Sequence, residues 1–165
     1  MPPTNNREPR TKNAMIGVIS DTHGRMHPKA VAALRGSDLI LHAGDIGSES
    51  ILTELRRVAP VHAITGNIDI EPLASKYPGT DVVEAGGKSF YMLHNVRGLD
   101  LDPKAAGFAA VIFGHSHKPE FYFEKGVLFF NPGSAGPRRF SLPISVGRIR
   151  IENGELLPEI VVLEE

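Results

Sequence analysis

Residues 15–45 read MIGVISDTHGRMHPKAVAALRGSDLILHAGD. This stretch begins with an apolar run at 15–20, continues with apolar residues at helical spacing over 27–35, and ends with a second apolar run at 38–43. The alternation predicts a strand, a helix and a second strand. Because a β-α-β unit places its two strands parallel in one sheet, the stretch indicates an α/β fold.

The same order continues on the C-terminal side of this unit. Residues 48–58 predict an amphipathic helix with Ser48 as its N-cap, and residues 60–65 predict a third strand. The second half has little helix, and its predicted strands are at 88–94, 109–113, 126–131, 144–151 and 159–164. An α/β half followed by a strand-rich half predicts two packed sheets with helices outside.

The composition is that of an ordinary globular chain. The 165 residues are 41% hydrophobic and 22% charged, which suits one domain with a sizeable core. The net charge of -1 does not favour specific nucleic-acid binding, and no apolar run approaches the length of a membrane span. The absence of cysteine excludes disulfides, thiolate nucleophiles and Cys-ligated zinc.

The N-terminal segment differs from the rest of the chain. Residues 1–13 are polar, contain proline and have no hydrophobic stretch of the kind found in secretory signals. We expect residues 1–13 to form a disordered extension and residues 14–165 to form a single domain. A cytoplasmic location is the expectation that fits these features.

Side chains of metal-binding types follow the predicted strands. They are Asp21 and His23, Asp45, Asn67 and Asp69, His94, and His115 and His117. Five separate strands contribute, and ligands of open α/β sheets bind at the carboxyl ends of strands. We therefore expect these side chains to converge on one rim.

The spacing of the residues supports a metal site. Asp21 and His23, like His115 and His117, are separated by one residue, and in an extended chain such residues point the same way. Oxygen and nitrogen donors without sulfur suit Mn, Fe, Zn or Ni. The set is larger than one ion needs, so it predicts two ions that share one carboxylate.

Two further predictions each leave an alternative open. His42, three residues before Asp45, is either a partner that orients a metal ligand or a structural histidine. Arg138 and Arg139 either clamp a phosphate group of the substrate or are simple surface charges.

The order of these residues resembles the signature of calcineurin-like metallophosphoesterases. The motifs that carry the resemblance are Asp21-x-His23, Gly44-Asp45, Gly66-Asn67, His94 and Gly114-His115-Ser116-His117. The short chain, the GNID form at 66–69 and the later NPGS at 131–134 resemble the small YfcE-type phosphodiesterases. The similarity spans residues 15–163, and it implies a four-layer α/β/β/α sandwich of two mixed sheets flanked by helices.

The resemblance also implies a ligand set. One divalent ion would be held by Asp21, His23 and His117. The second would be held by Asn67, His94 and His115. Asp45 would bridge the two ions, for which Mn is favoured and Ni, Zn and Fe also fit.

By the same resemblance, the chain would hydrolyse a small-molecule phosphodiester with a hydroxide that bridges the two ions. Asn67 would donate its amide N–H to the phosphoryl group, and Asp69 would act as the acid.

Two departures from the family pattern bear on this expected mechanism. Many relatives follow the fourth-strand histidine with Gly-His, whereas this chain has Asn95-Val96. Larger relatives place a histidine after Gly-Asn, whereas this chain has Ile68, which leaves Asp69 as the nearest substitute.

Two other functions compete with this hypothesis. One is a metal-binding scaffold for protein–protein contact with weak or no catalysis, as in the related retromer subunit. The other is a metal-dependent hydrolase of amides or lactones.

Substrate choice is expected to come from loops at 70–87 and 95–107. A homo-oligomer is compatible with the sequence, since residues 121–130 are either core or an exposed edge for a partner.

Overall fold

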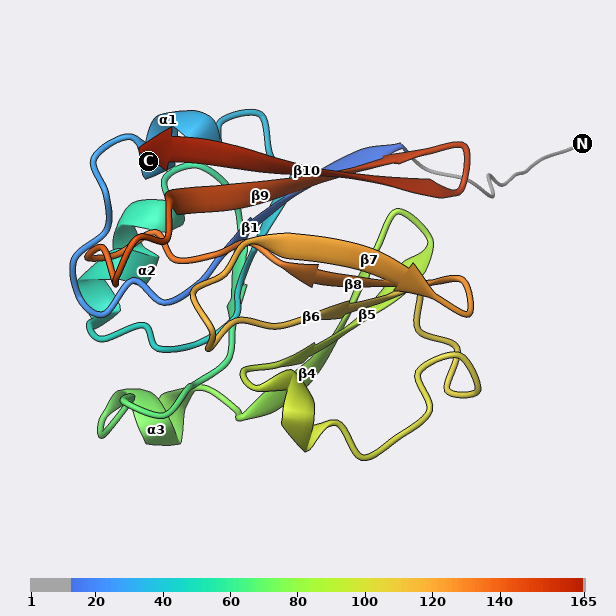
Figure 1. The fold of residues 1–165 in the computed structure, drawn as a ribbon, viewed down its shortest axis with the longest axis horizontal. Helices are drawn as coiled ribbons and strands as arrows, with labels where there is room; N and C mark the ends of the chain where they lie inside the picture. The colour runs from blue at the N-terminus through green and yellow to red at the C-terminus, as the bar shows by residue number, and fades with distance from the viewer. Residues whose placement is uncertain (1–12, 165) are drawn as a thin grey trace, which may run out of the picture.

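Two five-stranded β-sheets pack face to face in the computed structural model, which describes residues 13–164 (Figure 1). The first sheet contains β1 (Ala14–Ile19), β2 (Leu39–His42), β3 (Val61–Ala63), β9 (Ile144–Glu152) and β10 (Glu155–Glu164). Its strand order is β10-β9-β1-β2-β3. β1, β2 and β3 are parallel, which confirms the β-α-β reading of the N-terminal half.

The second sheet is also mixed. It contains β4 (Thr80–Ala85), β5 (Lys88–Leu93), β6 (Ala110–Ile112), β7 (Glu120–Glu124) and β8 (Val127–Asn131). Its strand order is β4-β5-β6-β8-β7. The three central strands are parallel, and the two edge strands β4 and β7 pair antiparallel with their neighbours.

Helices and loops cover the outer faces. The helices are α1 (Ala30–Ala33), α2 (Glu49–Leu55) and α3 (Leu73–Lys76), with a 3₁₀ helix at Val96–Gly98. α1 and α2 pack on the first sheet, and Ser48 caps α2 because its Oγ accepts from the Ser50 N–H at 3.2 Å. The outer face of the second sheet packs against the 3₁₀ segment. The predicted sandwich of two mixed sheets is confirmed.

Alternation along each strand divides the core into layers. In β5, Phe90 and Met92 point between the sheets, whereas Tyr91 and Leu93 point to the outer face of the second sheet. The first sheet shows the same pattern, with Ile16 facing the second sheet and Ile40 facing the helices. Successive side chains of a strand point to opposite faces, so these buried strands appear in the sequence as continuous apolar runs.

The structure corrects several boundaries. The predicted loop at 70–87 contains α3 and β4, and β7 was not predicted. Both missed strands are edge strands with exposed residues, so their apolar runs are short: two valines in β4 and three aromatic residues in β7, each flanked by charged residues. The predicted helices at 27–35 and 48–58 are shorter: the first loses residues at both ends, and the second ends in a turn over 56–58. The expectation of disorder at 1–13 falls outside the described residues except for Asn13, whose Oδ1 accepts from the Asn153 N–H.

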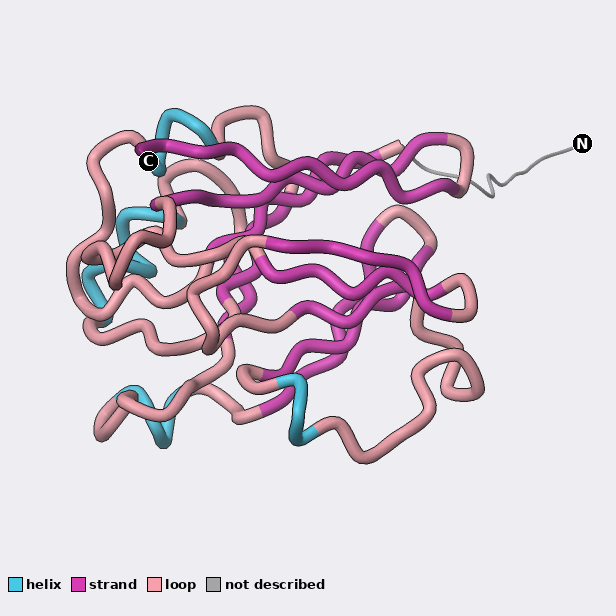
Figure 2. The backbone as a smooth tube through the Cα atoms, in the orientation of Figure 1, coloured by secondary structure: helices cyan, strands magenta, loops and turns pink. Residues whose placement is uncertain are grey.

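Connecting loops lie at both ends of the sandwich, and those at the left in Figure 2 are on the side where β1 ends. The predicted ligands lie in these loops. None of the helices within residues 13–164 is both long and apolar enough to cross a membrane.

Candidate metal centre

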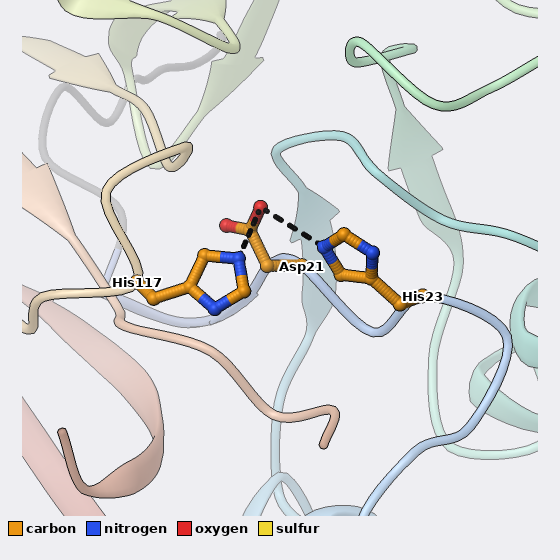
Figure 3. Close-up of side chains that lie close together, drawn as sticks. All are labelled: Asp21, His23 and His117. Atoms are coloured by element: carbon orange, nitrogen blue, oxygen red, sulfur yellow. Dashed lines mark ion pairs between the residues drawn. The ribbon is translucent and has the colours of Figure 1, made fainter. Parts of the chain in front are cut away.

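Five of the predicted ligands meet in one buried cluster. They are Asp21 and His23 after β1, Asp45 after β2, His94 after β5, and His117 after β6. They form two overlapping groups, Asp21–His23–His117 and Asp21–Asp45–His94, in each of which the potential ligand atoms lie within 4.8 Å of one another. Figure 3 shows Asp21 between the rings of His23 and His117.

One oxygen of each aspartate faces the histidines. Asp21 Oδ1 lies 3.4 Å from His117 Nε2, 3.7 Å from His94 Nε2 and 3.8 Å from His23 Nε2. Asp45 Oδ2 lies 3.3 Å from His94 Nε2 and 3.5 Å from His23 Nε2. Asp45 thus stands between a histidine of the first predicted ion site and a histidine of the second.

The other oxygen of each aspartate is held by the fold. Asp21 Oδ2 accepts from the Ser20 hydroxyl at 2.7 Å and from the His115 backbone N–H at 3.1 Å. Asp45 Oδ1 accepts from the Ile68 N–H at 3.0 Å. These bonds orient both carboxylates, which leaves Asp21 Oδ1 and Asp45 Oδ2 directed at the cluster.

His94 is oriented by the backbone. Its Nδ1 lies 2.7 Å from the Ala43 carbonyl oxygen, which can only accept, so the proton is on Nδ1. The lone pair of Nε2 then faces Asp21 and Asp45. A histidine whose outer nitrogen donates to a carbonyl is the usual arrangement of a metal ligand.

Five buried atoms of this cluster lack hydrogen bonds. Among residues 13–164, the buried side-chain atoms without a partner are Asp21 Oδ1, His23 Nε2, His94 Nε2, His117 Nδ1 and His117 Nε2. Leaving one such atom unpaired costs about 1–3 kcal/mol, so a concentration of them in one place needs a compensating ligand. Buried oxygen and imidazole ligands that lack hydrogen bonds and point toward one another are suited to bind a divalent metal ion.

The backbone at the predicted ligands is unusual. Left-handed φ values occur at Asp21 (56°), His23 (50°), Asp45 (54°), His115 (75°) and His117 (64°). The described residues contain eight such non-glycine positions, so most of them belong to the predicted ligand set. Each costs about 1–3 kcal/mol, and such strain concentrates at functional sites.

Two glycines allow the turns to approach the aspartates closely. A Cβ on Gly66 would lie 2.3 Å from Asp45 Oδ1, and a Cβ on Gly114 would lie 2.7 Å from Asp21 Oδ2. Both distances are too short for any side chain. The glycines that precede Asn67 and His115 are therefore required by packing at the site, although neither has a positive φ.

The cluster keeps its carboxylates ionised. Burial alone would raise the pKa of Asp21, but the neighbouring His117 and His23 outweigh burial and hold that pKa well below its usual range. The pKa of Asp45 is lowered in the same way, chiefly by His94 acting against burial. Burial would lower the pKa of His94, yet contact with Asp45 raises it. Ionised carboxylates give the cluster an affinity for cations.

Comparison with known proteins agrees with this geometry. A family model described as the calcineurin-like phosphoesterase superfamily domain matches residues 15–154. The chain belongs to this superfamily. A probable metallophosphoesterase of Methanothermobacter thermautotrophicus is 35% identical over 162 residues, which cover 89% of this chain and 91% of the relative. A protein named phosphodiesterase of Methanocaldococcus jannaschii is 28% identical and covers 72% of this chain and 82% of its own length.

Solved structures share the fold of this chain. A predicted phosphoesterase from Streptococcus pneumoniae has a TM-score of 0.75 at 23% identity, and the match covers 93% of this chain and 91% of that one. Vps29 from Chaetomium thermophilum has a TM-score of 0.72 at 19% identity, with 89% and 95% covered. At these identities the likeness concerns the fold alone.

The remaining two predicted ligands lie at the rim of the cluster. His115 is exposed, and its ring centroid lies 5.3 Å from that of His94. Asn67 is also exposed, and it lies between Gly66 and Ile68, which both contact Asp45. Both residues are near the cluster, and their roles as ligands stay predictions.

Asp69 has backbone contacts that the sequence did not predict. Its buried carboxylate accepts three backbone N–H bonds, from Ile46 at 3.1 Å, Gly47 at 2.9 Å and Gly66 at 2.9 Å. Both carboxylate oxygens are thus occupied by backbone donors. An acid role for Asp69 stays a prediction. In the structure, Asp69 ties the turn after β2 to the turn after β3.

His42 contacts the backbone of the ligand turns. Its Nδ1 accepts from the Gly44 N–H at 3.1 Å, so its Nε2 carries the proton and donates to Thr22 Oγ1 at 3.0 Å. The Thr22 hydroxyl donates in turn to the Ile46 carbonyl at 2.9 Å. His42 thus joins the turn of Asp21 and His23 to the turn of Asp45 through hydrogen bonds to Thr22 and to the Gly44 backbone.

The pKa of His42 predicts how stability depends on pH. Burial lowers this pKa from 6.5 to about 4, so the unfolded chain binds more protons than the folded chain between these values. Stability contributed by neutral His42 is therefore present above pH 6.5 and is lost as pH falls toward 4, by about 3 kcal/mol in total. Urea unfolding of chelator-treated protein checks this expectation.

A His42→Asn variant isolates the effect of this residue from that of the neighbouring carboxylates. We expect its stability to depend less steeply on pH than the wild type between pH 4 and 6.5. His27→Gln, at a partly exposed histidine, is the matched control. Equal slopes in wild type and His42→Asn would contradict the assignment.

Two polar residues that support the site were not predicted. Asn131 is fully buried, and its Nδ2 donates to the Gly114 carbonyl and to Ser116 Oγ, both at 3.1 Å. Ser134 Oγ donates to the Asp21 carbonyl at 2.9 Å. The NPGS motif that contains them was visible in the sequence, but their partners are distant along the chain.

Arg138 and Arg139 are exposed. Arg138 Nη1 donates to the Leu142 carbonyl at 3.1 Å, within its own loop. A phosphate clamp at these residues stays a prediction.

Proposed function

We propose that this chain is a metal-dependent phosphodiesterase with two divalent ions, for which Mn²⁺ is the favoured metal. The observation that carries the proposal is the cluster of bare, buried ligand atoms around Asp21 Oδ1 and Asp45 Oδ2. The two overlapping ligand groups share Asp21, and Asp45 Oδ2 lies between His23 and His94, so both carboxylates connect the two halves of the cluster. Such an arrangement suits a pair of ions better than a single ion.

The residues have distinct tasks in this proposal. Asp21, His23 and His117 would hold one ion, and Asn67, His94 and His115 would hold the other, with Asp45 between them. When bound, the ions would supply Lewis acidity that polarises the phosphoryl group and lowers the pKa of the attacking water. Asn67 is exposed, and in this proposal its amide would donate an N–H to a phosphoryl oxygen.

Apolar side chains at the rim favour a diester over a monoester. Ile68 is 43% exposed and Ile70 is 75% exposed, on either side of Asp69 in the turn beside Asp45. An apolar rim suits the second ester group of a diester better than the second negative charge of a monoester. The relative named phosphodiesterase points in the same direction.

Because three backbone N–H groups donate to the Asp69 carboxylate, we expect that this residue does not protonate the leaving group. Without a protein acid, the departing oxygen must carry its own negative charge, so the rate should fall as the leaving group becomes more basic. We expect bis(p-nitrophenyl) phosphate to be hydrolysed about 100-fold faster than diphenyl phosphate, or more. Steady-state kinetics on a series of aryl diesters measures this dependence. A rate independent of leaving-group basicity would show that the protein supplies an acid.

The direct test of the function compares two substrates under several metals. Hydrolysis of bis(p-nitrophenyl) phosphate and p-nitrophenyl phosphate is measured with Mn²⁺, Ni²⁺, Zn²⁺ and chelator in parallel. Metal-dependent turnover that prefers the diester supports the proposal. Turnover of amide or lactone substrates without phosphodiester turnover would favour a different hydrolase.

A metal-binding scaffold for protein contact is the second candidate. Vps29 has the same fold, and this chain carries Ile68 and Asn95-Val96 where many catalytic relatives have histidine. Protein that binds two ions and hydrolyses neither substrate with any metal would favour this candidate.

A further inference from the structure

The free edge of the second sheet carries three exposed aromatic residues. Among residues 13–164, β7 pairs only with β8, so its other side is an open edge in this part of the chain, at the front of the lower sheet in Figure 1. Phe121 is 42% exposed, Tyr122 is 40% exposed and Phe123 is 55% exposed. Consecutive aromatic residues on an open edge strand are unusual, because such an edge readily pairs with another chain.

The turn between β7 and β8 determines which backbone groups face outward. It consists of Lys125 and Gly126, with φ values of 52° and 82°, as in a two-residue type I′ hairpin turn. The pair that closes such a turn, Glu124 and Val127, is hydrogen-bonded. Because bonded and non-bonded pairs alternate, the N–H and C=O groups of Phe121 and Phe123 face away from β8.

The sequence of β7 reads the same in both directions. Residues 120–124 are EFYFE, with Tyr122 at the centre. A two-fold axis through Tyr122 would place Phe121 opposite Phe123 of the partner subunit in an antiparallel pair. The outward N–H and C=O groups of both phenylalanines would then form four hydrogen bonds across the axis.

We propose that β7 is a homodimer interface, in which two copies join their second sheets edge to edge through residues 120–124. The symmetric sequence favours a second copy of this chain over an unrelated peptide, because in this register Phe121 meets Phe123 of the partner subunit and aromatic cross-strand pairs are stabilising. The contact would bury the three aromatic side chains, the residue type that contributes most to interfaces.

The aromatic rings are already ordered for this contact. Phe121 stacks on Phe130 with an interplanar angle of 9°, and Tyr122 stacks on Phe129 with an angle of 4°. Phe130 belongs to the core between the sheets, whereas Phe129 belongs to the outer face, so the rings flank β7 on both sides. Rings held in place lose little rotational freedom on association.

Charges at the two ends of β7 limit the affinity. In the proposed register Glu120 lies opposite Glu124 of the partner subunit, and like charges directly opposite each other are destabilising. The dimer should therefore be reversible and depend on protein concentration. Replacing both glutamates by glutamine should strengthen it.

Sedimentation velocity over about 1 to 200 µM protein tests the proposal. We expect the wild type to shift from monomer to dimer across this range. Phe123→Lys should raise the dimer Kd at least tenfold. The matched control is Val82→Lys, because Val82 is 48% exposed on β4, the opposite edge of the same sheet, and this variant should dimerise like the wild type.

The double variant Glu120→Gln/Glu124→Gln tests the register without disturbing the aromatic residues. We expect its Kd to fall at least threefold relative to the wild type, with an unchanged far-UV circular dichroism spectrum. A wild type that stays monomeric at every concentration would overturn the proposal. A dimer that survives Phe123→Lys, or that Val82→Lys disrupts equally, would place the interface elsewhere.

Discussion

Asp45→Asn is expected to lower metal-dependent phosphodiester turnover by about 1,000-fold and to reduce the metal content below two ions per chain. The substitution is isosteric, so the bond from the Ile68 N–H to Oδ1 can be kept. What it removes is the charge and the lone pairs of Oδ2, which lies 3.3 Å from His94 Nε2 and 3.5 Å from His23 Nε2. Steady-state kinetics and elemental analysis of the purified variant measure both effects.

The matched control for this variant is Asp81→Asn, at a partly exposed carboxylate on β4. It should keep both the activity and the metal content of the wild type. A second readout is the pKa of His94 in metal-free protein, which contact with Asp45 raises and which should fall in Asp45→Asn. Two ions per chain in Asp45→Asn would show that this residue is not the shared ligand.

Asp69→Ala is expected to lower the stability of the protein by about 3 kcal/mol, or about 6–12 °C in Tm. The substitution leaves three backbone N–H groups, from Ile46, Gly47 and Gly66, without their acceptor. These groups belong to the turns that present Asp45 and Asn67, so metal affinity should fall together with stability. Thermal unfolding and metal titration by calorimetry measure the two losses.

The same variant separates a structural role from the acid role predicted from the sequence. If Asp69 only positions the turns, the remaining activity should depend on leaving-group basicity as in the wild type. If Asp69 also protonates the leaving group, the dependence should steepen in the variant, whereas the loss in Tm is expected in either case. Glu71→Gln, at an exposed carboxylate two residues away, is the matched control for both measurements.

Buried strands could be predicted from the sequence, whereas exposed ones could not. β1, β5, β6 and β8 are shielded on both faces, so they appear as continuous apolar runs. β4 and β7 lie at sheet edges and expose much of their surface, so their apolar runs are short. Helix ends were predicted less well because the last turn of α2 does not continue as a regular helix.

The candidate ligands could be predicted for a similar physical reason. Asp21, Asp45 and His94 each come directly or shortly after a buried apolar run, and parallel strands bring such positions to one edge. The role of Asp69 could not be predicted, because its partners are backbone N–H groups, which every residue type offers. The same holds for Asn131 and Ser134, whose acceptors lie in turns far away in the chain.

The sequence by itself determined the α/β class, the family resemblance and the identity of the residues that meet in the cluster, because residue type and order along the chain suffice for those conclusions. Only the tertiary structure decided which oxygen of Asp21 and of Asp45 has no hydrogen bond from the fold, and which nitrogen of His94 has none. It also decided that backbone N–H groups donate to Asp69, and that β7 is an open edge within residues 13–164. These properties depend on hydrogen bonds and strand neighbours that form only when distant segments come together, so no local pattern encodes them.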